Sequence, residues 1–298
     1  MSSFFGINLN PVVDLQEMWK YQFMQHAFEA GTLIALIAGV TGYFVVLRRS
    51  AFTAHAFSEI GFAGAAFSIL VNVAPIAGLL GGSISGGLAI AALGRRATNR
   101  DTQIGIVLAF SLGLGLLFIS LYAGYETEAY SILFGEILGI SAGAVSLTVV
   151  ASVLLLGVTA LIYRPLLFAS LDEDVAEAKG MPMFWLGIVF MVIVAVAVSF
   201  AVQVTGVLLI FSLMVTPAAT AQYVARRPQR AIILSVVIAV IAVWSGLFIA
   251  FFTPYPVSFF ITAEVFGLYL VVRLVHLGRG PAHLHRKGEQ PTEEELAA

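Results

Sequence analysis

The sequence lacks cysteine and has few charged residues. Cysteine is absent from all 298 positions, which excludes disulfides and thiolate metal sites. Only 11% of the residues are charged, whereas a soluble domain has about 25%. Hydrophobic residues make up 60% of the chain, and the mean hydropathy is +0.98. Because a water-soluble globule could not bury so much apolar surface, the composition indicates a polytopic membrane protein.

Several sequence motifs are also missing. There is no phosphate-binding loop of the form GxxxxGK[ST], so the chain does not bind ATP in that way. There is no HExxH, and no nucleophile stands beside an evident base, which argues against an intramembrane enzyme. No basic residue precedes Lys20, so the N-terminus does not resemble a cleaved signal peptide. If the protein pumps, its energy comes from another subunit or an ion gradient.

Apolar stretches recur that are each long enough to cross a bilayer as a helix. We predict an all-α polytopic membrane protein with about nine transmembrane helices. Their expected ranges are 24–47, 52–72, 75–93, 103–123, 141–163, 183–202, 206–222, 231–252 and 257–277. Residues 130–140 are too short to cross and are expected to be re-entrant or interfacial. Residues 203–206 must form a turn between two spans.

The positions of the basic residues predict the orientation. With nine spans and the N-terminus outside, every lysine and arginine except Lys20 falls on the cytoplasmic side. The chain then divides into an external N-terminal segment (1–23), a transmembrane domain (24–277) and a cytoplasmic tail (278–298) expected to be disordered. We expect a multi-pass protein of the bacterial cytoplasmic membrane.

Two residues in the second span could bind a metal. His55 and Glu59 are four residues apart, so they lie on one helix face. A glutamate in the middle of a membrane costs about 2.5–3.5 kcal/mol, which favours a polar cavity over lipid. An imidazole nitrogen and a carboxylate oxygen suit zinc, manganese or iron(II). Alternatively, His55 lies near the headgroups and Glu59 pairs with an arginine.

Other candidates are weaker. His26 and Glu29 are three residues apart near the outer end of the first span. Glu264, in the ninth span, should face the protein interior, either as a metal ligand or in a structural hydrogen bond. Pro217 is expected to break or kink its helix.

One connecting segment predicts a short cytoplasmic helix. Asp172, Glu173 and Asp174 favour a helix N-terminus, and Gly180 and Pro182 end the helix. The segment is either an amphipathic connector or a docking helix for a partner protein.

Five segments, in order, resemble the membrane permease subunit of zinc/manganese-type ATP-binding-cassette importers. They are "GYFVVLRRSAFTAHAFSEIGFAGAAFS" (42–68), "DTQIGIVLAFSLGLGLLFIS" (101–120), "SILFGEILGIS" (131–141), "LDEDVAEAKGMP" (171–182) and "TGVLLIFSLMVTPAATAQ" (205–222). The resemblance covers about residues 22–277. Two positions depart from it: the family commonly has an aspartate followed four residues later by a histidine, where this chain has His55 and Glu59.

The resemblance implies a function and partners. It implies alternating-access import of a divalent metal ion, with His55 and Glu59 holding the ion transiently. Two cytoplasmic ATPase subunits would contact the coupling helix, an extracytoplasmic solute-binding protein would deliver the ion, and a second permease copy would complete the pathway in the membrane lipid. The coupling residues would be Asp172, Glu173, Ala176, Glu177 and Gly180. We expect no catalytic residue, covalently bound cofactor or nucleic-acid partner.

Two alternatives stay open. One is a secondary transporter driven by an ion gradient, which the coupling-helix segment argues against. The other is a permease of the same class that carries a metal chelate. The histidine and carboxylates fit a bare ion better, but they do not identify the metal.

Overall fold

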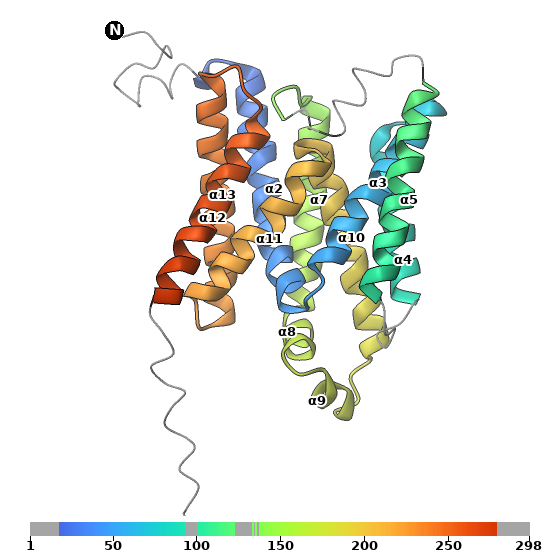
Figure 1. Ribbon diagram of the computed structural model, residues 1–298, viewed down its shortest axis with the longest axis vertical. Helices are drawn as coiled ribbons and strands as arrows, with labels where there is room; N and C mark the ends of the chain where they lie inside the picture. The colour runs from blue at the N-terminus through green and yellow to red at the C-terminus, as the bar shows by residue number, and fades with distance from the viewer. Residues whose placement is uncertain (1–17, 93–99, 123–132, 134, 136, 279–298) are drawn as a thin grey trace, which may run out of the picture.

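The computed structural model consists of long helices that stand side by side, with two short helices at one end (Figure 1). It describes residues 18–92, 100–122, 133, 135 and 137–278. All regular secondary structure within these ranges is helical. The helices are α2 (Gln22–Leu47), α3 (Ala51–Leu70), α4 (Pro75–Ala92), α5 (Arg100–Ser120), α7 (Ala142–Leu161), α8 (Tyr163–Leu171), α9 (Glu173–Ala178), α10 (Met183–Thr205), α11 (Val207–Val224), α12 (Pro228–Phe251) and α13 (Val257–Gly278).

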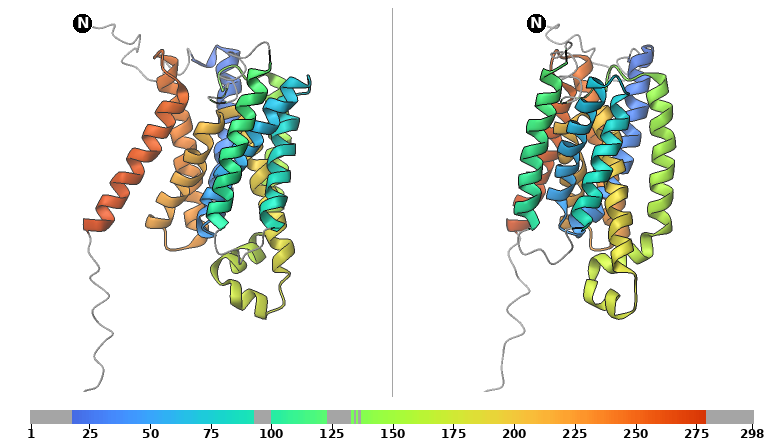
Figure 2. Two further views of the ribbon diagram at one scale, coloured as in Figure 1. Left: turned by 45° about the vertical axis from the view of Figure 1, so that its right-hand side comes forward. Right: turned by 90° about the vertical axis from the view of Figure 1, so that its right-hand side faces the viewer.

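The long helices form two groups around a shared centre. On one side α3 packs against α4 and α5, and on the other side α11, α12 and α13 pack against one another. The central helices α2 and α10 contact both groups, and α7 packs on α2 (Figures 1 and 2). Since α3 also contacts α11, one face of α3 lies against the other group.

Seven of the described helices are long and apolar enough to cross a membrane. They are α2, α5, α7, α10, α11, α12 and α13. α4 qualifies only as a shorter apolar helix over Pro75–Ile90, and α3 is not among the seven. The hydropathy of α3 is lowered by polar residues such as His55, Ser58 and Glu59, and the last two are buried in the protein. The all-helical membrane fold is confirmed, while the number of nine spans stays a prediction.

A helix occupies each of the nine expected ranges, and most ends agree within a few residues. The turn expected at 203–206 is formed by one residue, Gly206, whose φ of 81° is accessible to glycine and strained for other residues. The segment 130–140 lies mostly outside the described residues, as do residues 1–17 and the tail after Gly278.

Most basic residues gather at one end of the bundle. Successive long helices alternate in direction, so the turn between α2 and α3, the turn between α11 and α12, and the α8–α9 pair share the end at which α13 finishes (Figure 1). Those segments hold Arg48, Arg49, Arg164, Lys179, Arg226, Arg227, Arg230 and Arg273. Lys20 precedes α2 at the opposite end. This asymmetry fits the expected orientation, which stays a prediction.

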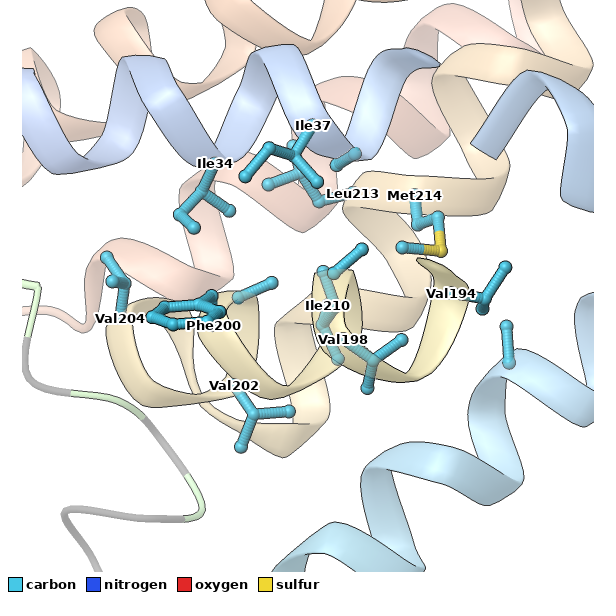
Figure 3. Packing of buried hydrophobic residues seen from close by; sticks show 14 of the residues in the cluster. Ile34, Ile37, Val194, Val198, Phe200, Val202, Val204, Ile210, Leu213 and Met214 are labelled. Carbon is cyan, nitrogen blue, oxygen red and sulfur yellow. The ribbon is translucent and has the colours of Figure 1, made fainter. Parts of the chain in front are cut away.

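Interlocking aliphatic side chains fill the centre. Ile34 and Ile37 of α2 face Val198 of α10 and Ile210 and Leu213 of α11, and all five are buried (Figure 3). Large apolar residues make this core dense, whereas α3 and α4 meet through glycines. Small residues let membrane helices approach closely. The approach brings the carbonyl oxygen of Gly64 against Gly78, and it fixes α3 against α4.

Candidate metal-binding site

His55 and Glu59 lie in the second and third turns of α3. Glu59 is only 5% exposed, and His55 is partly buried. An α-helix rises about 1.5 Å per residue, so the two side chains are separated by about 6 Å along the axis on the same face. The Oγ of Ser58 donates a hydrogen bond of 2.7 Å to the carbonyl oxygen of His55. The predicted pair is therefore placed inside the protein on one face of α3.

The most informative feature of this pair is its missing hydrogen bonds. The Nδ1 atom of His55 and the Oε2 atom of Glu59 are both buried, and neither has a hydrogen-bond partner within the described residues. An unsatisfied buried polar group costs about 1–3 kcal/mol. The arrangement costs stability by itself, and it leaves an imidazole nitrogen and a carboxylate oxygen available as donors to a ligand.

An aromatic ring from the other helix group packs against the imidazole. The ring centroids of His55 and Phe211 are 5.1 Å apart, and their planes are inclined by 58°. Phe211 belongs to α11 and is 39% exposed. The imidazole is therefore at the contact between α3 and α11, where a relative movement of the two helix groups would change its surroundings.

The structure does not bring the weaker candidates to this pair. Within the described ranges no group of three or more histidine, aspartate or glutamate residues could hold a metal ion. Glu29 is exposed on α2, and His26 is partly buried near the start of that helix. The carboxylate of Glu264, on α13, instead accepts a hydrogen bond from the Oγ of Ser245 on α12. Among the described residues of one chain, only His55 and Glu59 are clustered in this way.

Pro217 does not break its helix, while the kink that was the other expectation stays a prediction. α11 continues from Val207 to Val224 with Pro217 inside it. A proline removes only one N–H from the ladder, and the hydrogen bonds on either side hold the helix together. The C-terminal end of α11 is fixed to α2, because the Nε2 of Gln222 donates a hydrogen bond of 3.2 Å to the carbonyl oxygen of Tyr43.

The short helix expected near residues 171–180 is confirmed as α9. The Oδ1 of Asp172 caps it by accepting a 3.0 Å hydrogen bond from the N–H of Val175. After the helix, Gly180 has a φ of 76°. Of the five candidate coupling residues, Ala176 is buried, and the other four, namely Asp172, Glu173, Glu177 and Gly180, are exposed.

Arg48 was not singled out from the sequence, yet it joins three helices. It is the C-cap residue of α2, and it stands six residues before Ala54, which lies in the first turn of α3. Its Nη1 lies 3.4 Å from the Oγ of Ser170 on α8, and its guanidinium stands 4.9 Å from the ring centroid of Phe190 on α10. The sequence signal was only a basic pair between two apolar runs, because the partners lie more than 100 residues away.

Curated relatives align with most of the chain. A manganese transport system membrane protein, MntC, from Listeria monocytogenes is 27% identical, over 80% of this chain and 85% of MntC. A high-affinity zinc uptake system membrane protein, ZnuB, from Buchnera aphidicola is 27% identical, over 77% of this chain and 88% of ZnuB. The relatives thus include membrane proteins of both manganese and zinc transport systems.

A solved structure has the same fold. PsaBC from Streptococcus pneumoniae, determined in complex with a Fab, superposes with a TM-score of 0.81 at 27% identity, and the match covers 90% of this chain and 100% of the matched chain. The helices and these relatives agree on a multi-pass protein of the bacterial cytoplasmic membrane. Residues 20–276 match the ABC 3 transport family, and the chain belongs to that family of membrane permeases.

Proposed function

We propose that this chain is the permease of an ATP-driven importer that moves a bare divalent metal ion, manganese, zinc or iron(II), into the cytoplasm by alternating access. The observation that carries the proposal is the pair of buried, unpartnered atoms, Nδ1 of His55 and Oε2 of Glu59, one helical turn apart. Imidazole and carboxylate are ligands of these metals. The manganese and zinc systems of the relatives support the same class of cargo.

A second copy of the chain completes the ligand set. Within the described part of one chain, His55 and Glu59 have no third histidine or carboxylate beside them, whereas zinc is usually bound by four ligands. A two-fold axis presents the same surface of both copies to each other, so it would double the pair to two imidazoles and two carboxylates. Phe211, which packs beside His55, is partly exposed, so this part of the chain is accessible to a second copy.

The helix pair α8–α9 is the proposed contact for the ATPase subunits. It projects beyond the ends of the long helices (Figures 1 and 2). Its residues Asp172, Glu173 and Glu177 are exposed, and they give this end of the bundle an acidic surface. An extracytoplasmic binding protein would deliver the ion at the opposite end. ATP-driven movement of α8–α9 would then shift the two helix groups about the contact between His55 and Phe211.

Transport assays in vesicles test this function. The permease is reconstituted with the ATPase subunits and binding protein of its own system, and uptake of Mn²⁺, Zn²⁺ and Fe²⁺ is measured separately. We expect uptake of at least one ion to require ATP hydrolysis and to persist when ionophores dissipate ion gradients. Uptake by the permease alone that stops with the ionophore would instead establish a gradient-driven transporter.

Replacing Arg48 by glutamine is expected to uncouple ATP hydrolysis from transport. The side chain connects α8 to the end of α2 and to Phe190 of α10, so its loss weakens the path from α8–α9 to the helices around α3. Coupling of this kind between distant sites is typically worth about 1–3 kcal/mol, which corresponds to about a 5–150-fold change. We expect metal uptake per ATP hydrolysed to fall at least about 5-fold.

The control for Arg48 is Arg273→Gln, which removes an exposed charge from α13, outside the proposed ATPase contact, and should leave the coupling unchanged. The Arg48 variant should still bind the ATPase subunits and hydrolyse ATP. An unchanged ratio of metal transported to ATP hydrolysed in Arg48→Gln would exclude the residue from coupling.

A further inference from the structure

A basic pocket lies where α11 turns into α12. It has a volume of about 610 Å³ and is lined by Val224, Ala225, Arg226, Arg227, Arg230, Ile233, Leu234 and Val237. Three arginines within five residues of sequence therefore line an otherwise aliphatic pocket. This pocket is separate from His55 and Glu59, and the transport mechanism above does not use it.

The arginines are free to bind an anion. Arg226, Arg227 and Arg230 are all exposed, and in the described part of the chain none of them makes an ion pair. Three unpaired guanidiniums side by side repel one another, and an anion between them removes that repulsion. Arginine binds phosphate oxygens through two parallel N–H donors, which makes a phosphate group the best match.

The apolar part of the pocket continues into the span. Ile233, Leu234 and Val237 follow Arg230 at intervals of three, four and seven residues, so they lie on the same face of α12. Ile233 is 64% exposed and Val237 44% exposed on a helix that crosses the membrane. From Arg230 to Val237 the helix rises about 10 Å, most of the roughly 15 Å depth of one leaflet. A soluble anion would leave this aliphatic surface uncovered, whereas an acyl chain would cover it.

We propose that the α11–α12 pocket binds an anionic phospholipid, with its phosphate between Arg226, Arg227 and Arg230 and one acyl chain along Ile233, Leu234 and Val237. Basic pockets at the cytoplasmic ends of membrane helices are suited to such headgroups. The bound lipid would hold the turn between α11 and α12. Because α11 also carries Phe211 against His55, the lipid would stabilise the side of the bundle that contacts the metal ligands.

The test compares lipids on the purified full-length permease. Lipid retention is measured by native mass spectrometry, and the melting temperature is measured in nanodiscs of phosphatidylcholine with or without phosphatidylglycerol. We expect phosphatidylglycerol to be retained and to raise the melting temperature. In Arg226→Gln/Arg227→Gln/Arg230→Gln we expect its affinity to fall about 100-fold, since each surface cation contributes about 5-fold. The single variant Arg230→Gln should give an intermediate loss if the triple variant folds poorly.

The matched control removes an equal charge from the same end of the bundle. Arg164→Gln/Lys179→Gln/Arg273→Gln should bind phosphatidylglycerol as the unmodified protein does. Equal loss in both triple variants would overturn the proposal, because binding would then reflect net charge alone. Stabilisation by inorganic phosphate without lipid would assign the pocket to a soluble anion. Loss of ATPase subunits from Arg226→Gln/Arg227→Gln/Arg230→Gln, with lipid binding unchanged, would assign it to a protein partner.

Discussion

Substituting Glu59 by alanine is expected to abolish metal uptake without lowering the amount of folded permease in the membrane. Its buried Oε2 makes no hydrogen bond within the described residues, so the side chain contributes little to folding and removing it leaves no partner unsatisfied. Changes in groups that only support a metal ligand cost about 10–100-fold in affinity, and loss of a ligand costs at least as much. We expect uptake to fall more than about 10-fold in Glu59→Ala and in His55→Ala, measured in cells that lack the native chain.

The first span provides a control of matched chemistry. His26 and Glu29 are the same residue types three positions apart, but Glu29 is exposed and neither residue joins the α3 pair. His26→Ala and Glu29→Ala should therefore retain uptake. Uptake at the unmodified level in His55→Ala/Glu59→Ala, with equal membrane abundance, would remove the α3 pair from the mechanism.

Exchanging the two ligand types is a further test of the same site. In the family that the sequence resembles, the carboxylate comes first and the imidazole four residues later, the reverse of His55 and Glu59. If the pathway needs one ligand of each type from each chain, His55→Asp/Glu59→His should recover part of the uptake that either single substitution loses. No recovery, with the protein folded, would indicate that the order of ligands is itself fitted to the cargo.

Helix positions followed from the sequence because the membrane constrains them strongly. A bilayer requires about 20 apolar residues in every spanning helix, and backbone groups must be satisfied within the helix. The ranges of α2, α10 and α12 were therefore visible as apolar runs between charges. Polar residues in α3 did not hide the helix itself, because an apolar run with a few polar residues still predicts a helix, although α3 is not among the seven helices apolar enough to cross a membrane.

Contacts between distant helices did not follow from the sequence. The packing of His55 against Phe211 joins residues in α3 and α11, and the bond from Arg48 to Ser170 joins residues separated by 122 positions. Neither has a local pattern, since each depends on how the two helix groups fold together. Pro217 is the opposite case, because a strong local rule predicted a break or a kink and α11 continues through the proline without a break.

Replacing Gly78 by alanine is expected to destabilise the whole α3 side of the bundle. A Cβ atom at Gly78 would overlap the carbonyl oxygen of Gly64 and the Oγ of Ser68. The first of these is backbone, so no change of rotamer relieves the overlap and α3 and α4 must separate. Overpacking of this kind costs about 1–3 kcal/mol. We expect a lower melting temperature and less folded protein in the membrane.

Gly81, three residues further along α4, is the matched control, because a Cβ atom there would meet nothing within 4 Å. Both substitutions gain the same helix propensity, about 1 kcal/mol for alanine over glycine, so their difference isolates the packing. Gly81→Ala should be at least as stable as the unmodified protein. Gly64→Ala should destabilise like Gly78→Ala, and the double variant should lose less than the sum, because one separation of the helices relieves both overlaps. Equal melting temperatures for Gly78→Ala and Gly81→Ala would contradict the close α3–α4 contact that positions His55 and Glu59.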